Sequence, residues 1–379
     1  MTPALPSLSP SALLPQWPPA RIGNFPIDLL MRTTSSPGRD VALYYLARTA
    51  LFHGLRALGI GSGDVVLMPA YHHGVEVETV RATGAGVHFY AIDRRFQADL
   101  DDLRRLSRAL RTRALYLTHF LGLSQPLDPL LAWARERGLL VIEDCALALL
   151  SRDPSGRSLG SHGDLAIFCL YKSVPVPHGG LAVSRVRLPR LTTSPWLATC
   201  HHLSGSLLAR CELVGAAPWL RQGARWLSRS LIDRAVPPVP VGRQHLRTSE
   251  LHLGASRIVP HLLRRFDFEQ IAVRRRRNYH RLLAMLDERA VPSGALPPGT
   301  VPLFLPLAVA DRQLALAHFH RARIEAVDFW RHGDPSCQED RFADTRWLRR
   351  HVIELPIHQD LDDEVVDQIG RVAREVRHA

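Results

Sequence analysis

The sequence predicts an α/β protein, in which a large three-layer domain with a mixed, mostly parallel sheet precedes a smaller carboxyl-terminal α/β domain. Short β-branched or apolar runs alternate with helix-period segments from about residue 48 to residue 184. Several runs are almost continuously apolar, which is typical of strands buried on both faces. A length of 379 residues also exceeds what one small core needs.

Each element follows from its pattern. The predicted strands of the large domain are residues 65–69, 87–92, 114–120, 139–144, 164–170 and 180–184. Helical patterns, with apolar residues recurring every three or four positions, lie at residues 48–59, 99–110 and 128–138. After residue 250 we expect a long helix, a strand at 301–309, a further helix and a strand at 352–357.

The domain boundaries follow from changes in composition. We expect an amino-terminal extension over residues 1–34, the large domain over 35–245 and the small domain over 246–379. A Leu-, Trp- and Arg-rich insertion over about residues 188–241 ends in the proline-rich stretch AVPPVPVG, which indicates a linker. The insertion is predicted to form amphipathic packing helices, and a peripheral membrane surface is the weaker alternative.

Charge and cysteine content exclude several classes of protein. The formal charge is +12, and arginines are spread along the chain with one dense run at 274–277. We interpret this run as a solvated helix face rather than a nucleic-acid patch, since no nucleic-acid-binding motif accompanies it. The five cysteines form no CxxC pair, which disfavours a metal site or a disulfide framework and fits a reducing cytoplasm. The sequence shows neither a convincing signal peptide nor an apolar run long enough to span a bilayer.

Lys172 is the single lysine among 48 Lys and Arg residues. Arginine carries charge as well as lysine does, but it cannot lose its proton and so cannot act as an amine nucleophile. A lone lysine in an arginine-rich chain therefore points to a Schiff base with a carbonyl substrate or with pyridoxal phosphate, although a stray surface lysine is the simpler alternative.

Suitable partners follow the ends of other predicted strands, where parallel α/β sheets bind ligands. One strand ends at Glu143 and Asp144, and a buried carboxylate there could hold a pyridinium nitrogen protonated or merely cap a helix. Tyr71, His72 and His73 follow another strand and offer flat rings for stacking on a heterocycle.

A phosphate anchor is predicted at the start of an early helix. Arg48 and Thr49 stand at this helix amino terminus, which is suited to an anion, although a plain helix cap would also explain them. In chain order, the sequence thus provides a phosphate anchor, a stacking ring, a pyridinium partner and an amine nucleophile.

Longer motifs carry a family resemblance. The stretches ALFHGLRALGIGSGDVVLMPAYHH, GLLVIEDCALA, LGSHGDLAIFCLYK and HGGLAVS, with the closing RRHVIELPIHQDLDDEVVDQI, resemble the DegT/DnrJ/EryC1/StrS family. This is a family of pyridoxal-phosphate-dependent sugar aminotransferases with the aspartate aminotransferase-like fold, fold type I. The resemblance runs from about Val41 to the carboxyl terminus.

The resemblance implies roles for individual residues. Lys172 would form the Schiff base with pyridoxal phosphate and move the proton, Asp144 would pair with the pyridine nitrogen, and His73 takes the ring-stacking position. The positions that contact the cofactor phosphate in the family correspond to Arg48, Thr49, Ala50, Cys169 and, from a neighbouring subunit, His245. Three residues depart from the family pattern: Ala47 replaces a glycine, Leu147 a glutamine or histidine, and Cys169 a serine.

The resemblance also implies the activity. The expected enzyme transfers an amino group from an amino acid, glutamate in the first place, to a nucleotide-linked keto-sugar in polysaccharide biosynthesis. It would be a cytoplasmic homodimer with shared active sites, without a metal and without nucleic acid as a partner. Two alternatives stay open: another pyridoxal-phosphate reaction, and a non-catalytic member with a scaffolding or membrane-surface role.

Overall fold

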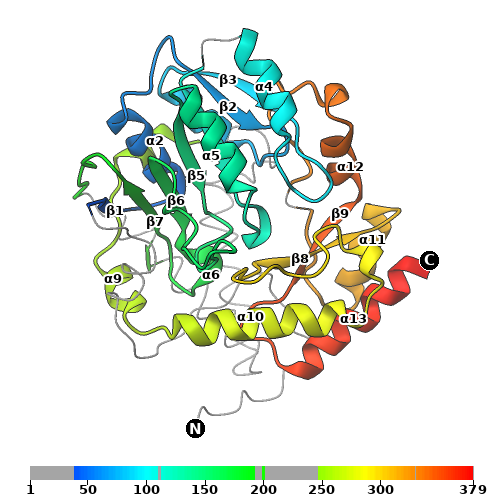
Figure 1. Ribbon diagram of the computed structural model, residues 1–379. Coiled ribbons are helices and arrows are strands. Elements are labelled where there is room, and N and C mark those ends of the chain that lie inside the picture. The colour runs from blue at the N-terminus through cyan, green and yellow to red at the C-terminus, as the bar shows by residue number, and fades with distance from the viewer. Residues whose placement is uncertain (1–37, 110–111, 193–198, 201–245, 329, 379) are drawn as a thin grey trace.

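The computed structural model describes residues 38–109, 112–192, 199–200, 246–328 and 330–378 (Figure 1). The predicted amino-terminal extension, most of the predicted insertion and His245 lie outside these residues. The division into domains at residue 245 therefore stays a prediction.

A seven-stranded mixed sheet forms the larger part of the molecule (Figure 1). Its strands are β1 (Asp40–Tyr44), β2 (Val65–Pro69), β3 (Gly86–Tyr90), β4 (Ala114–Thr118), β5 (Leu140–Asp144), β6 (Leu165–Cys169) and β7 (Gly180–Ser184). The spatial order is β1-β7-β6-β5-β4-β2-β3, and only the pairs that involve β7 are antiparallel. The predicted fold class is confirmed, although β1 was not predicted, because this strand pairs only at the sheet edge and its apolar pattern is short.

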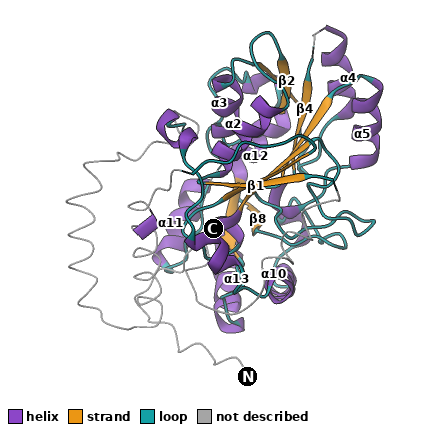
Figure 2. Cartoon of the chain, turned by 90° about the vertical axis from the view of Figure 1, so that its left-hand side faces the viewer, coloured by secondary structure: helices purple, strands orange, loops and turns teal. Residues whose placement is uncertain are grey.

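Helices cover both faces of this sheet (Figure 2). The helices α2 (Ala47–Ala57) and α3 (Val75–Ala82) lie on one face, and α4 (Leu100–Ala109) and α5 (Leu127–Glu136) lie on the other. Side chains alternate along β2, so that Val66 and Met68 belong to the core under α2 and α3 while Leu67 belongs to the opposite core. Burial on both faces explains why the strands are almost continuously apolar.

A two-stranded antiparallel sheet forms the centre of the smaller part. The strands are β8 (Phe304–Ala308) and β9 (Val352–Pro356), and the helices around them are α9 (Ile258–Leu263), α10 (Phe268–Leu283), α11 (Arg312–Arg321), α12 (Ala343–His351) and α13 (Asp363–His378). Helices α10 and α13 lie side by side below the larger part in Figure 1. One hydrophobic core continues from the α4–α5 face of the large sheet into these elements.

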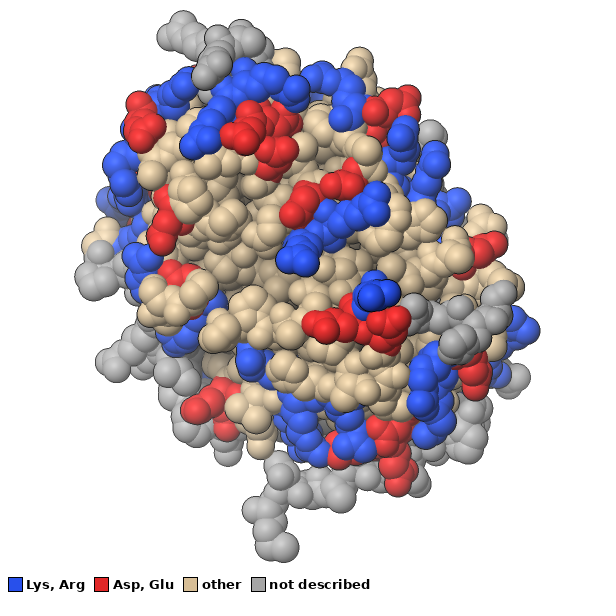
Figure 3. All heavy atoms as spheres, turned by 45° about the vertical axis from the view of Figure 1, so that its right-hand side comes forward, with Lys and Arg blue, Asp and Glu red and all other residues tan. Residues whose placement is uncertain are grey.

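The arginine run at 274–277 corrects one prediction. It lies on α10 as expected, but only part of it is solvated: Arg277 is exposed, whereas Arg275 is only 2% exposed. The Arg275 guanidinium donates to the Leu303 carbonyl over 2.9 Å and to Gln359 Oε1 over 2.9 Å. On the face drawn in Figure 3, arginines alternate with carboxylates and form no single basic patch. This run therefore joins segments within the protein.

Candidate active site

A cavity of about 330 Å³ lies at the carboxyl ends of the parallel strands. Its volume is at the lower end of the roughly 300–1,000 Å³ of small-molecule sites. The lining residues are Leu46, Ala47, Arg48, Leu51, His73, Val75, Glu76, Tyr116, Asp144, Ala146, Leu147, Ile167, Cys169, Tyr171, Lys172 and Trp330. The cavity thus brings together five of the predicted site residues, which are Arg48, His73, Asp144, Cys169 and Lys172.

Lys172 lies in the one-turn helix α6 (Leu170–Ser173) that follows β6 directly. Groups from the smaller part hold the backbone of this turn. Arg275 Nη2 donates to the carbonyl oxygens of Lys172 at 3.5 Å and Ser173 at 3.3 Å, and Gln359 Nε2 donates to the Ser173 carbonyl at 3.3 Å. The backbone of the turn that carries Lys172 is therefore held by residues distant from it in the sequence.

Asp144 ends β5 and is buried, with 8% of its surface exposed. The Tyr116 hydroxyl donates to Oδ2 over 2.9 Å, and the backbone N–H of Ala146 donates to Oδ1 over 2.9 Å. Burial raises the pKa of Asp144, while these two hydrogen bonds and the charge of Lys172 oppose the rise. A cation brought into the cavity beside this carboxylate would compensate its burial.

Of the three predicted rings, only His73 lines the cavity. Tyr71 is in the core, stacked on Trp330 with ring centroids 5.2 Å apart. His72 is fully buried and its Nε2 accepts the backbone N–H of Asp334 over 2.7 Å. Burial and the neighbouring Arg349 lower the pKa of His72 to about 3, so it is a neutral structural side chain.

The predicted phosphate anchor is only partly in the cavity. Arg48 lines it, whereas Thr49 and Ala50 do not, although both are fully buried. The Thr49 hydroxyl donates to the Glu250 carbonyl over 3.1 Å, and Arg48 Nη1 lies 3.7 Å from Glu250 Oε2. Within the described part of the chain, no side chain caps the amino terminus of α2, and its first turn holds no acidic residue, so backbone N–H groups there are available to an anion.

Gly180 allows the start of α2 to lie where it does. A Cβ at this position would collide with the carbonyl oxygen of Leu46 and the amide nitrogen of Ala47. Only glycine therefore permits β7 to pass this close to the helix amino terminus. The glycine pair noted in the HGGLAVS motif thus has a packing reason beside the cavity.

Glu76 and Trp330 are two of the lining residues that the sequence analysis missed. Glu76, in the first turn of α3, is 7% exposed, and its Oε1 accepts the backbone N–H of His73 over 2.8 Å. Burial and the charge of Asp144 raise the pKa of Glu76 to about 7. An acid three residues after His73 at a helix start is a local pattern that could have predicted this contact.

Trp330 is the second missed residue and comes from the smaller part. Its ring meets His73 edge-on, with ring centroids 6.1 Å apart. The Arg349 guanidinium is 2% exposed and holds this arrangement, because it donates to the carbonyls of Trp330 at 2.6 Å and of Ala70 and His72 at 3.1 Å each. Nothing local in the sequence joins these segments.

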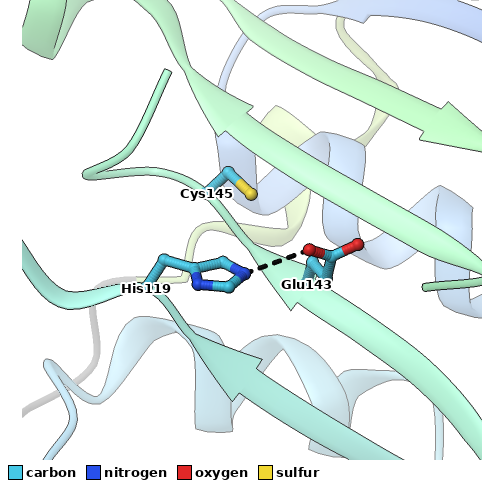
Figure 4. Close-up of side chains that lie close together, drawn as sticks. All are labelled: His119, Glu143 and Cys145. Atoms are coloured by element: carbon cyan, nitrogen blue, oxygen red, sulfur yellow. Dashed lines mark hydrogen bonds and ion pairs between the residues drawn. The ribbon is translucent and has the colours of Figure 1, made fainter. Parts of the chain in front are cut away.

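Behind the cavity, His119, Glu143 and Cys145 form a buried cluster, shown in Figure 4. Glu143 Oε2 accepts from His119 Nε2 over 3.1 Å and from a backbone N–H of residue 160, and Oε1 accepts from those of residues 162 and 163. The backbone N–H of Gln125 donates to His119 Nδ1 over 3.3 Å, which leaves the His119 proton on Nε2. Both histidine nitrogens and both carboxylate oxygens are thus engaged, and the cluster is an internal hydrogen-bond network rather than a set of ligands.

Comparison with known proteins places this architecture. Residues 47–185 match the model of the DegT/DnrJ/EryC1/StrS aminotransferase family, which confirms the predicted resemblance over that segment. The fold is shared with the S. venezuelae protein DesV, with a TM-score of 0.65 and 20% identity over 93% of this chain and 88% of DesV. DesI in the presence of its TDP-sugar product gives a TM-score of 0.64 and 18% identity over 98% of this chain and 94% of DesI.

Curated relatives match over shorter stretches. A UDP-N-acetyl-3-dehydro-alpha-D-glucosamine 3-aminotransferase from Acidithiobacillus ferrooxidans is 30% identical over 220 residues, which is 52% of this chain and 59% of the relative. The GDP-perosamine synthase of Escherichia coli O157:H7 is 31% identical over 138 residues, which is 36% of this chain and 37% of the relative. The chain therefore matches less than two thirds of the length of either protein.

Proposed function

We propose that the protein is a pyridoxal-phosphate-dependent aminotransferase that moves an amino group from an amino acid, such as glutamate, to a nucleotide-linked keto-sugar. The observation that carries the proposal is the position of Lys172, the single lysine, in one cavity with Asp144, His73 and Arg48. The matched family and relatives act as aminotransferases by name, which supports this chemistry.

The residues present fit the cofactor. The amino terminus of α2 with Arg48 suits a phosphate, and a protonated pyridine nitrogen would compensate the burial that raises the pKa of Asp144. His73 offers a flat ring on the cavity wall, and Lys172 offers an amine. When bound, pyridoxal phosphate supplies an electron sink for negative charge that develops on the substrate carbon.

The protein's own groups then have definite tasks. Lys172 would hold the cofactor through its amine, and the same amine would move the proton at the reacting carbon of the substrate. Asp144 would hold the ring nitrogen, and the donors Tyr116 and Ala146 on its two oxygens favour its ionised form. Leu147 and Trp330 add apolar walls that exclude water from the reacting groups.

The departures from the family pattern all lie on the cavity wall. Ala47, Leu147 and Cys169 line it, so each alters a surface that the ligand would touch. Burial raises the pKa of the Cys169 thiol, which therefore contributes a neutral, weakly polar group in place of a serine hydroxyl. We infer a weaker hold on the cofactor phosphate than a serine would give.

The cofactor test uses the uniqueness of Lys172. Purified protein mixed with pyridoxal phosphate should show a visible band that borohydride removes, and peptide mapping should place the pyridoxyl group on the Lys172 peptide. Lys172→Ala should give no such label, and Lys172→Arg should retain a positive charge without the label. A label elsewhere, or none in the wild-type protein, would overturn the proposal.

The reaction test uses the amino donor. Adding glutamate should convert the band, and UDP-, GDP- and dTDP-linked keto-sugars should then restore it with release of an amino-sugar. If glutamate converts the band but none of these keto-sugars restores it, the proposed cofactor stands and the proposed class of sugar substrate is rejected. A product formed without an amino donor would indicate another pyridoxal-phosphate reaction.

Assembly and location belong to the same proposal. We infer a homodimer, in which the segment around His245 would reach the partner's cavity, and a cytoplasmic location with metabolite sugars as substrates. Among the described residues, no helix combines the length and the apolar character required to cross a bilayer. Sedimentation of the wild-type protein, and loss of cofactor affinity in His245→Ala, would test the shared site.

A further inference from the structure

Two buried carboxylates share the cavity, and the tasks assigned above use only one of them. Asp144 is 8% exposed and Glu76 is 7% exposed, and both line the same space. Two like charges in a poorly hydrated site repel each other and each loses solvation, so both ionise only at a large cost in free energy. One of the two is therefore expected to keep a proton.

Hydrogen-bond donors decide which carboxylate keeps it. Asp144 receives the Tyr116 hydroxyl on one oxygen and the Ala146 N–H on the other, each over 2.9 Å. The Glu76 carboxylate receives the His73 N–H on Oε1 over 2.8 Å and interacts with its own backbone N–H, but among the described residues it has no hydroxyl donor comparable to that of Tyr116. Donors on both oxygens favour the ionised form at Asp144. Burial, followed by the charge of Asp144, raises the pKa of Glu76 from its usual 4.5 to about 7.

Both signs of charge surround Glu76. The titratable or charged groups that face it or share its cavity are Asp144 on β5, Tyr116 on β4, Cys169 on β6, Tyr171 and Lys172 on α6, Arg349 on α12, His73 before α3 and Arg48 on α2. Arg349 is already engaged by three backbone carbonyls and by Glu339 at 3.0 Å. Lys172 faces both Glu76 and Asp144, so its charge is shared between the two carboxylates.

We propose that Glu76 is the proton-holding and positioning residue of the cavity: of the two carboxylates it is the one that keeps its proton up to neutral pH, and it fixes the backbone of His73. With Glu76 neutral, Asp144 is the one ionised carboxylate in the cavity lining, opposite Arg48 and Lys172. The cavity is then suited to an anionic ligand. In that state the two cations Arg48 and Lys172 outnumber the single ionised carboxylate. Ionisation of Glu76 at higher pH adds a second negative charge, so the binding of a phosphate-bearing ligand weakens. This consequence rests on the proposed function.

The first test measures the proton without any ligand. Ionisation of buried Glu76 disfavours the folded state, so the wild-type protein should lose stability relative to Glu76→Gln as pH rises from about 5 to about 8.5. Gln keeps an oxygen that accepts the His73 N–H but carries no charge. Glu78→Gln is the matched control, since Glu78 lies on the same helix outside the cavity lining. A pH-independent difference between the wild-type protein and Glu76→Gln would falsify the proposal.

The second test measures the consequence for binding. Pyridoxamine 5′-phosphate has no aldehyde, so its binding does not need a covalent bond to Lys172. Between about pH 6 and pH 8.5, its Kd for the wild-type protein should rise several-fold relative to its Kd for Glu76→Gln, and titration of the probe cancels in the ratio. A constant ratio would overturn the role of Glu76 in binding. Failure of the probe to bind either protein would count against the proposed cofactor, while the stability profile would still decide where the proton lies.

Discussion

Glu143 and Asp144 are neighbours at the end of β5, and the two faces of the sheet give them opposite environments. Glu143 is fully buried and accepts four hydrogen bonds, one from His119 and three from backbone N–H groups of residues 160, 162 and 163. Asp144 faces the cavity, and its carboxylate accepts two hydrogen bonds, one from the Tyr116 hydroxyl and one from the backbone N–H of Ala146. Burial raises the pKa of both, but the donors to Glu143 outweigh it and lower its pKa to about 2, whereas the pKa of Asp144 remains raised.

The difference shows how a structural carboxylate can be told from a functional one. A carboxylate whose lone pairs are all satisfied within the protein has nothing left to offer a ligand, and its charge stabilises the fold. A carboxylate that is buried but incompletely satisfied is costly for the fold and is retained where a ligand compensates it. The following predictions test this contrast.

The largest effect is expected from Asp144→Asn. The amide cannot hold a positive charge on a ring nitrogen, so the amination rate should fall on the order of 10²–10³-fold. Stability of the ligand-free protein should stay the same or increase, because a buried and poorly compensated charge is removed. Amination rates and urea unfolding of the same preparation measure the two quantities. A wild-type rate would contradict the role assigned to Asp144.

Glu143→Gln should show the opposite pattern. In the wild-type protein, backbone N–H groups donate to both oxygens of the carboxylate. In the variant, some of these donors would face the amide NH2 group instead, so the free energy of unfolding should fall by about 3 kcal/mol. The rate per folded molecule should change little, since Glu143 is not part of the cavity lining. Denaturant unfolding with active-site titration separates the two effects. An equal loss of amination rate in Glu143→Gln and Asp144→Asn would contradict the assignment of a structural role to Glu143 and a functional role to Asp144.

The pH dependence of stability should distinguish the two carboxylates by sign. The pKa of Glu143 falls from 4.5 to about 2 on folding, so its contribution of about 3 kcal/mol is present above pH 4.5 and is lost as pH falls toward 2. The pKa of Asp144 rises from 3.8, so its ionisation lowers stability as pH increases above that value. The measurement is the free energy of unfolding of the wild-type protein minus that of each amide variant, from pH 2 to pH 7. With rising pH this difference should increase for Glu143→Gln and decrease for Asp144→Asn.

The smallest effect is expected from Tyr116→Phe. This change removes one of the two donors to Asp144 and leaves the carboxylate in place. A hydrogen bond to a charged group contributes about 1.5–3 kcal/mol, so the rate should fall roughly tenfold at neutral pH, and less at higher pH where Asp144 is fully ionised. A pH–rate profile is the measurement. A uniform loss at every pH would show that Tyr116 acts by packing rather than through Asp144.

Much of this arrangement is visible in the sequence because it is local. Each of Asp144, Lys172 and His73 follows a strand that its apolar run predicts, and parallel strands bring their carboxyl ends together. The arginine run was predicted as a helix but assigned to the surface, because side-chain periodicity does not show that Arg275 finds backbone carbonyls to satisfy it. Trp330 could not be predicted, since its position beside His73 depends on the packing of segments distant in the sequence.

Thr49 shows a different limit of prediction. Its place at a helix amino terminus suggested a phosphate contact, yet its hydroxyl is occupied by the carbonyl of Glu250, 201 positions later in the chain. Glu76 was missed because a lone glutamate in a helix is usually solvated, and only the structure shows its burial. Local patterns therefore predicted which elements carry the site, but they did not predict which hydrogen-bond partner each polar side chain takes in the folded protein.

The hydrogen bonds from Arg275 and Gln359 to the Lys172 turn have a consequence for the nascent chain. Their donors lie 103 and 186 positions beyond the carbonyls that they reach. During translation, the lysine therefore emerges from the ribosome long before the groups that hold its turn, and a partly synthesised chain cannot present the amine as the finished protein does. Cofactor capture should accordingly be a late event of biogenesis, after residue 359 has been synthesised and the smaller part has packed.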